Sequence, residues 1–190
     1  MTGRERLEAA SDRDVLAAIA SGSQDALEVL YARLGQRLFR FLVGLVGGDA
    51  ARAEDAMSEA FFEVWRRAPT FRGDSAVRTW VFGIARHKAL SLVRRQRPSE
   101  PDEALEAVAS GEPDVLSGMM EDEAREQVRQ ALDALSPEHR EVIELSLYQN
   151  FTYEEIAEIV GCPVNTVKTR AFNARRQLKR RLAGLAGTER

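Results

Sequence analysis

Hydrophobic residues in the first part of the chain recur at steps of three and four positions, the spacing of an amphipathic helix. Ser11 is placed to cap a short helix that extends to Ala20, and a longer helix follows from Ser23 to about Val46. One apolar stripe runs along this longer segment: Leu27, Leu30, Leu34, Leu38, Phe41 and Leu45. The stripe predicts a face that is buried against other helices.

Two further helices complete this pattern. Gly47 and Gly48 end the second helix, and Asp49 caps a third helix that reaches Ala68. A fourth helix is expected over about 75–97, after a turn that contains proline and glycine. The inward positions of these two helices are Ala53, Ala56, Met57, Ala60, Phe61, Val64, Trp65, Trp80, Ile84, Leu90 and Val93. Together the four segments predict one helical bundle.

The helical pattern fails over residues 98–118, which hold three prolines, two glycines and many acidic residues. Such a segment is too polar to bury enough surface to fold alone, so we expect a flexible acidic linker. It separates an N-terminal module, 1–97, from a C-terminal module, 119–190. Helical spacing resumes over about 119–135, and a serine followed by proline begins the next helix, about 137–148.

The end of the C-terminal module has the spacing of a helix-turn-helix. Thr152 and Glu155 form a capping box for a short helix that ends at Gly161, and Pro163 opens a last helix that reaches about Leu182. Glycine at the turn supplies a positive φ, and small side chains let the two helices approach. The expected inward residues are Ile156, Ala157, Val160, Val167, Ala171, Ala174 and Leu178.

Composition supports an all-α protein of two small helical domains, because residues that favour helices greatly outnumber those that favour strands. The single cysteine, Cys162, permits no intrachain disulfide, which fits a reducing compartment. No stretch approaches the roughly 20 apolar residues of a membrane span. We therefore expect a cytoplasmic protein with no membrane insertion, no cofactor and no bound metal.

The net charge of −3 conceals a strong segregation of charge along the chain. No acidic residue falls between Asp74 and Glu100 or between Glu158 and Glu189, and both gaps are rich in arginine and lysine. The stretch 100–123 contains no basic residue. A polyanion responds to the local field, so two cationic faces are expected to meet nucleic acid.

The last helix presents polar and basic residues opposite its apolar side. Its N-terminal positions are those that reach base edges in a DNA major groove, and Lys168 is the first candidate for a base contact. The base-reading candidates are Asn165, Thr166, Lys168, Thr169, Phe172, Asn173 and Arg176. The candidates for phosphate contacts are Arg170, Arg175, Lys179 and Arg180. The alternative is a solvated basic helix on a small bundle.

The N-terminal module combines an acidic helix face with a basic, aromatic helix. Glu54, Asp55, Glu59 and Glu63 occupy the polar side of the third helix, which predicts a basic partner. Aromatic rings amid arginines in the next segment suit unstacked single-stranded DNA, since rings receive bases and cations follow phosphates. The candidates are Phe71, Arg72, Ser75, Arg78, Trp80, Arg86, His87 and Lys88. Alternatively, Trp80 and the nearby Phe82 belong to the core.

Taken together, these segments resemble the ECF (extracytoplasmic function, group IV) sigma factors of RNA polymerase over nearly the whole chain. AEDAMSEAFFEVW resembles sigma region 2.2, which docks on the β′ clamp helices of polymerase. FRGDSAVRTWVFGIARHKAL resembles regions 2.3 and 2.4, which melt and read the −10 element. LSPEHREVIELSLYQNFTYEEIAEIVGCPVNTVKTRAFNARRQL resembles region 4, whose final helix reads the −35 element.

The resemblance implies a promoter-recognition factor whose partners are core polymerase, through the β′ clamp helices and the β flap, promoter DNA and an anti-sigma factor. It places Glu54, Asp55, Ser58 and Glu59 at the polymerase. It also implies that the loop 71–75 shapes a pocket for a flipped base. Two residues depart from the family pattern: Ser58 stands where glutamine is frequent, and His87 where asparagine is frequent.

Two other functions remain open at this stage. A LuxR-type transcriptional regulator would share the segment GCPVNTVKTR, but its first half should contain a receiver or ligand domain. An enzyme reading would use Glu54, Asp55, Glu59 and Glu63 as metal ligands, although no histidine lies at ligand spacing.

Overall fold

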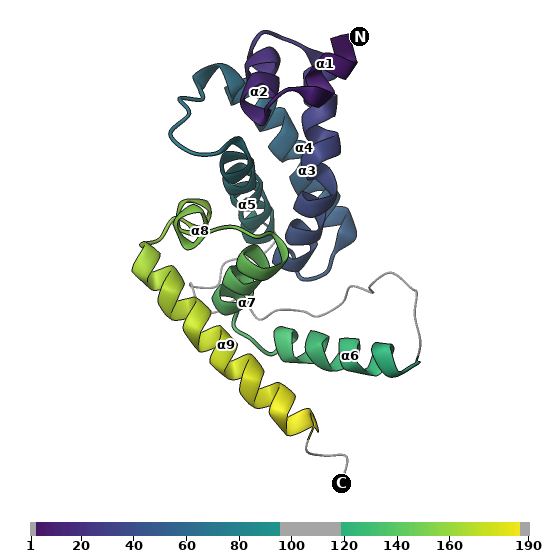
Figure 1. The fold of residues 1–190 in the computed structure, drawn as a ribbon, viewed down its shortest axis with the longest axis vertical. Coiled ribbons are helices and arrows are strands. Elements are labelled where there is room, and N and C mark those ends of the chain that lie inside the picture. The colour runs from purple at the N-terminus through teal and green to yellow at the C-terminus, as the bar shows by residue number, and fades with distance from the viewer. Residues whose placement is uncertain (1–2, 96–118, 187–190) are drawn as a thin grey trace.

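The computed structural model describes residues 3–95 and 119–186, and every regular element in these two ranges is helical. The linker expected at 98–118 lies outside the described residues. The N-terminal module contains α1 (Gly3–Ala9), α2 (Asp12–Ala20), α3 (Gln24–Leu45), α4 (Ala50–Arg67), the 3₁₀ turn η1 (Ala68–Thr70) and α5 (Val77–Arg95). The C-terminal module contains α6 (Met119–Asp133), α7 (Pro137–Ile143), the π-helical turn η2 (Glu144–Tyr148), α8 (Tyr153–Val160) and α9 (Val164–Ala186) (Figure 1).

Side-chain caps begin the helices of the N-terminal module where the sequence predicts them. The hydroxyls of Ser11 and Ser23 accept hydrogen bonds from backbone N–H groups three residues further on, and the Asp49 carboxylate does the same. Each cap satisfies an N–H group that has no partner within its helix. The starts of α2, α3 and α4 are therefore fixed locally.

The first helix was not expected, because its sequence has no apolar stripe and none of its residues is buried. Arg33 of α3 accounts for its end. The Arg33 guanidinium donates to the carbonyl oxygens of Leu7, Glu8 and Ala10, each at 2.9 Å, and pairs with Asp12 at 2.6 Å. A cap supplied from a distant helix leaves no signal in the local pattern.

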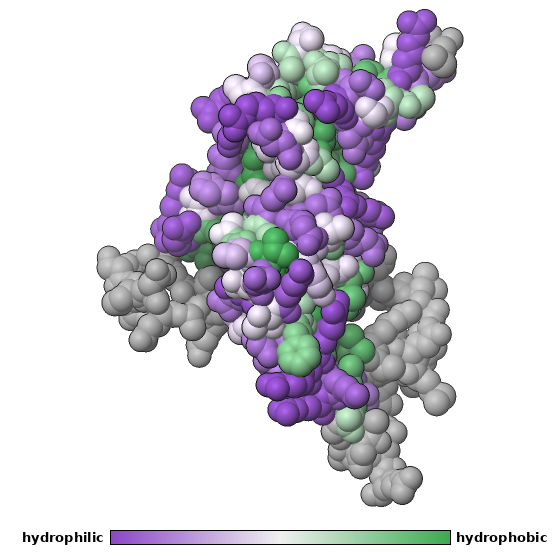
Figure 2. All heavy atoms as spheres, turned by 60° about the vertical axis from the view of Figure 1, so that its left-hand side comes forward, coloured by the Kyte–Doolittle hydropathy of each residue, from purple (hydrophilic) through white to green (hydrophobic). Residues whose placement is uncertain are grey.

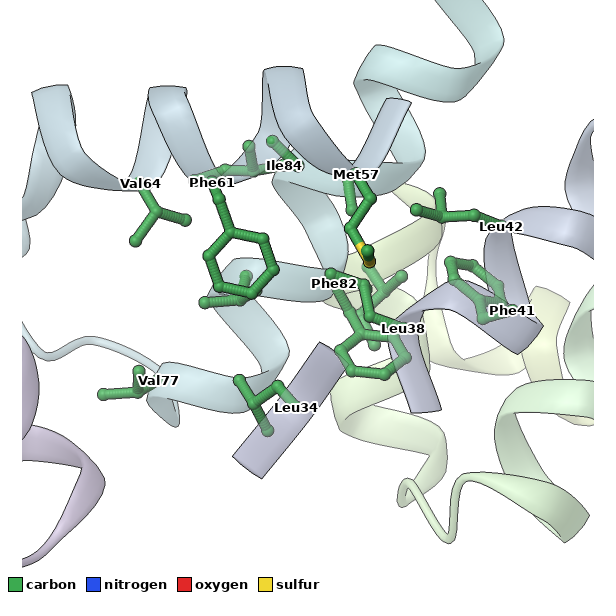
Figure 3. Close-up of a cluster of buried hydrophobic side chains, with 14 of the residues drawn as sticks. Leu34, Leu38, Phe41, Leu42, Met57, Phe61, Val64, Val77, Phe82 and Ile84 are labelled. Atoms are coloured by element: carbon green, nitrogen blue, oxygen red, sulfur yellow. The ribbon is translucent and has the colours of Figure 1, made fainter. Parts of the chain in front are cut away.

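The core of the N-terminal module lies where α3, α4 and α5 pack together (Figure 3). Its side chains include Leu34, Leu38, Phe41, Met57, Phe61, Val64 and Ile84 from the predicted stripes, together with Phe82 and with Leu42 and Val77, which the stripes did not include. Phe82 is fully buried and packs against Phe41 with ring centroids 5.5 Å apart. Phe82 is thus a core residue, and Trp80 is only partly buried.

The two modules pack against each other through α5 and α8, which lie side by side (Figure 1). Phe151, at the start of the helix-turn-helix, packs edge-on against Phe82 with ring centroids 4.9 Å apart. Buried residues of both modules therefore form one continuous apolar cluster. A smaller cluster of Leu135, Ile143 and Ala174 joins α7 to α9 within the C-terminal module.

We expect Phe82→Ala to lower the free energy of unfolding by about 3–5 kcal/mol, the usual cost of truncating a buried phenylalanine. The matched control is Phe62→Ala on α4, where the ring is 68% exposed and the change should stay within about 0.5 kcal/mol. Denaturant unfolding followed by circular dichroism measures both. Equal losses for the two variants would contradict the placement of Phe82.

Candidate nucleic-acid interface

The helix-turn-helix is built by local interactions that the sequence predicts. The Thr152 hydroxyl accepts a hydrogen bond from the Glu155 N–H at 3.2 Å, while the Glu155 carboxylate accepts from the Thr152 N–H at 2.8 Å. Gly161 ends α8 in the left-handed conformation, with φ of 71°. On the inner side, Val167 and Ala171 are fully buried, so α9 packs closely on α8. The capping box and the turn are confirmed.

The opposite side of α9 is open to solvent. Phe172 is 65% exposed, although a ring of this size is usually buried. Asn165, Lys168, Thr169 and Arg176 are exposed beside it, and Thr166, Arg170 and Asn173 are half-buried. The face that contains α8 and the start of α9 is mostly hydrophilic, with small hydrophobic patches (Figure 2). The predicted base-reading residues thus lie on one accessible helix face.

The phosphate candidates continue along the same helix. Lys179 and Arg180 are exposed, whereas Arg175 donates a hydrogen bond to the Tyr153 hydroxyl at 2.7 Å. This bond ties α9 to the first turn of α8, so Arg175 also has a structural contact. Arg170 is half-buried and lies close enough to Glu138 to favour its charged form, so Lys179 and Arg180 are the candidates best placed to face a phosphate backbone.

The acidic face of α4 is smaller than the sequence suggests. Glu54, Asp55 and Ser58 are exposed, but Glu63 is only 9% exposed and pairs with Arg66 at 2.7 Å. The hydrogen bond from Arg66 lowers the pKa of Glu63 and keeps its carboxylate ionised. Glu63 is therefore part of an internal ion pair and does not belong to the exposed acidic face.

Lys88 of α5 connects this face to the basic helix. Its ammonium lies 3.5 Å from Glu63 and 3.8 Å from Glu59. Lys88, a predicted DNA-binding residue, therefore neutralises part of the charge of the acidic helix. One exposed residue of α4 was missed from the sequence: Phe62, one turn beyond Ser58, carries its ring outside the core. Its exposure could have been predicted from its position, because helical spacing places Phe62 on the same side of α4 as Asp55 and Ser58.

The loop between η1 and α5 shapes a cavity of about 490 Å³. Phe71 packs against Trp80 with ring centroids 5.1 Å apart, which brings two predicted aromatic candidates together. Arg72 pairs with Asp74 at 3.2 Å in solvent, and His87 is exposed on α5. The lining of the cavity is Asp12, Arg13, Phe71, Gly73, Ser75, Ala76, Val77, Arg78 and Glu155. Arg13 was not predicted, because it precedes the loop by nearly sixty residues.

Two of the predicted DNA-binding arginines contact the C-terminal module and are only partly exposed. The Arg86 guanidinium binds both carboxylate oxygens of Glu141 in α7, with Nη2 at 3.2 Å from Oε2. The guanidinium of Arg78 lies 4.1 Å from the ring centroid of Phe151. It also donates to the carbonyl oxygens of Gln149 and Asn150, each at 3.4 Å. In this conformation the C-terminal module binds two arginines that the sequence analysis predicts to contact DNA.

The same interface contains polar groups that are poorly satisfied. The Gln149 side chain is buried and donates to the Arg37 carbonyl oxygen at 3.4 Å, but its own Oε1 has no hydrogen-bond partner among the described residues. Burial raises the pKa of Glu144, although Gln149, Arg140 and Arg40 counteract the rise. Each such group reduces the net stability of the contact between modules.

None of the described helices combines the length and the apolar character needed to cross a membrane.

Comparisons with known proteins match both modules. Residues 30–99 match the family model Sigma-70 region 2, and residues 125–178 match Sigma-70, region 4. The ECF RNA polymerase sigma-E factor of Escherichia coli (strain K12) is 31% identical over 186 residues, which cover 92% of this chain and 96% of the relative. The RNA polymerase sigma-H factor of Pseudomonas aeruginosa is 30% identical over 188 residues, which cover 92% and 95%.

A solved structure has a similar fold over most of the chain. The sigma factor RpoE from Bartonella quintana, in complex with the anti-sigma factor NepR, matches with a TM-score of 0.60 and 25% identity. The match covers 81% of this chain and 96% of that structure. The match of residues 30–99 to region 2 lies where a LuxR-type regulator would carry a receiver or ligand domain.

Glu144→Gln is expected to stabilise the folded protein increasingly as pH rises. Because burial raises the folded-state pKa, the penalty for ionised Glu144 is absent below its unfolded pKa, about 4.3, and complete above the folded pKa. Unfolding free energies of the variant and the unsubstituted protein at several pH values give the difference. Glu154→Gln, at an exposed position of α8, is the matched control, and a difference that shrinks toward high pH would refute the assignment.

Proposed function

Because this chain belongs to the ECF class of RNA polymerase sigma factors, which direct promoter-specific transcription initiation, we propose that three surfaces of its two modules carry this role. The first is the exposed side of α9 around Lys168 and Phe172. The second is the acidic face of α4, and the third is the loop 71–75 with the start of α5. The exposed side of α9 is the observation that carries the proposal.

The first surface reads the −35 element. A helix-turn-helix places its second helix in the major groove, with the N-terminal residues of that helix at the base edges. Lys168, Thr169 and Phe172 occupy those positions and are exposed. Lys179 and Arg180, further along α9, contact phosphates and add affinity without sequence choice.

The second surface docks on the polymerase. Glu54, Asp55 and Ser58 form an exposed polar strip that suits the basic surface of the β′ clamp helices. The ring of Phe62 extends this strip by one helical turn and adds an apolar contact. The C-terminal module contacts the β flap.

The third surface captures the −10 element as a single strand. Phe71 and Trp80 supply rings beside the cavity, while Arg72, Ser75, His87 and Lys88 contact the strand around it. Arg78 and Arg86 join them only when the C-terminal module moves away, because both are bound to that module here. Promoter opening therefore requires that the modules separate.

The packed conformation is the inactive one, and an anti-sigma factor holds it. The Bartonella quintana relative was solved in complex with such a protein, which supports this regulation. The chain itself makes and breaks no covalent bond, since core polymerase supplies the chemistry. It acts in the cytoplasm, where polymerase and promoters are.

Run-off transcription with core polymerase tests the proposed function. On a promoter selected from genomic fragments, Lys168→Ala should lower the transcript yield on the order of ten-fold or more, and the size of this loss should depend on the identity of one −35 base pair. The matched control Arg180→Ala should lower transcription from all promoters by about the same factor. It should also reduce the dependence of promoter binding on salt concentration. If the unsubstituted protein gives no transcript from any selected promoter, the proposed function is wrong.

Glu141→Gln tests whether the packed conformation is held by the Arg86 pair. The variant removes one charge of a pair whose carboxylate is almost fully buried, so Arg86 loses its ionic partner and the modules should separate. Small-angle scattering of the full chain should then show a larger radius of gyration. The exposed Glu158→Gln is the control, and an unchanged radius for Glu141→Gln would show that this pair does not hold the modules.

A further inference from the structure

The cavity beside the loop 71–75 is bounded on one side by α2, which the −10 surface described above does not include. In the packed conformation its volume is about 490 Å³, with Glu155 of the C-terminal module as part of the lining, so separation of the modules removes that residue and opens the cavity. Phe71, held against Trp80, provides a ring on which a base can stack. Asp12 and Arg13 line the cavity from the first turn of α2.

Arg13 lies directly across the backbone of this loop. A Cβ atom placed on Gly73 would come within 2.6 Å of the Arg13 Nη2 atom and 3.1 Å of its Cζ atom. Gly73 also has a φ of 80°, which favours glycine independently. Glycine at this position therefore both turns the loop and leaves room for a guanidinium against it.

The guanidinium of Arg13 has no ionic partner within residues 3–95 and 119–186. Of its two acidic sequence neighbours, Asp12 is bound by Arg33 at 2.6 Å, and Asp14 accepts a hydrogen bond from the Ser11 hydroxyl at 2.7 Å. The other acidic lining residue, Glu155, is held by Thr152, Thr79 and Arg78. An arginine whose donors are free, beside an aromatic ring in a cavity, can bind a ligand that offers acceptors.

Arg78, the second cation of the cavity, has a different orientation. It contacts the Phe151 ring and two backbone carbonyl oxygens of the C-terminal module. When the modules separate, these contacts are lost and Arg78 can follow a phosphate. Arg13 is then the cation left to face the base edge.

We infer that Arg13 determines which base the loop accepts, and that the preferred base is guanine. This inference rests on the proposed function. A guanidinium has only donors, and two adjacent acceptors on one base edge, O6 and N7 of guanine, match its fork. Adenine places an amino donor beside N7, so it would oppose the same contact.

The experiment compares four versions of one −10 position on a promoter that the unsubstituted protein transcribes with core polymerase. The position is the one at which base changes in the non-template strand alter transcription most. We expect guanine to be preferred on the order of ten-fold or more, and Arg13→Ala to abolish that preference while the −35 preference stays unchanged. Arg13→Lys should restore only part of it, because lysine offers a point charge without the fork.

Arg6→Ala, an exposed arginine on the neighbouring helix α1, is the matched control and should leave all preferences unchanged. An equal loss on all four bases in Arg13→Ala would show a phosphate contact, and an unaltered preference would show no contact; either overturns the inference. A preference for a base other than guanine overturns it as well. If the unsubstituted protein yields no transcript from any promoter, the proposed function fails first.

Discussion

Phe82 serves two packing contacts at once, and the arrangement of the whole molecule depends on it. Its ring lies against Phe41 within the N-terminal bundle and against Phe151 of the C-terminal module. Because the ring is fully buried, α5 cannot rotate to expose it without opening both contacts. The helix that carries the −10 candidates is thereby the same helix on which the C-terminal module packs.

The rest of the contact between modules is more polar than the core around Phe82. Arg86 and Glu141 form a buried pair, whose attraction is largely offset by the cost of removing both charges from water. Gln149 adds a buried oxygen without a partner among the described residues. An interface of this kind is specific in its geometry but modest in its net stability, which suits the proposed separation of the modules.

Much of the fold could be predicted from sequence because its determinants are local. The caps at Ser11, Ser23 and Asp49, the capping box of α8 and the turn at Gly161 each involve residues within a few positions of one another. The stripes of α3 and α4 likewise predicted the core. The exposed side of α9 followed from the same periodicity, since the residues opposite a buried stripe face solvent.

The sequence did not reveal what depends on distant partners. Helix α1 is ended by Arg33, and Glu63 is taken out of the acidic face by Arg66 and Lys88. Arg78 and Arg86 lie in a basic, aromatic segment that predicts DNA binding. Nothing in the local sequence pattern indicates that Phe151 and Glu141 contact them. Charge and periodicity identify which residues belong to a face but not which other segment covers it.

Glu155 illustrates how the two modules can part without either one unfolding. Its carboxylate receives the Thr152 N–H and hydroxyl within α8, and it receives the Thr79 hydroxyl across the interface. Burial opposes the charged form of Glu155, but the hydrogen bonds from Thr152 and Thr79 and the nearby Arg78 outweigh it and lower the pKa, so the group stays charged. Of the interactions that Glu155 makes with described residues, the hydrogen bond from Thr79 and the pairing with Arg78 cross between modules. The proposed separation can thus proceed as a hinge-like rigid-body movement in which α8 and α9 stay intact, with no secondary structure to rebuild.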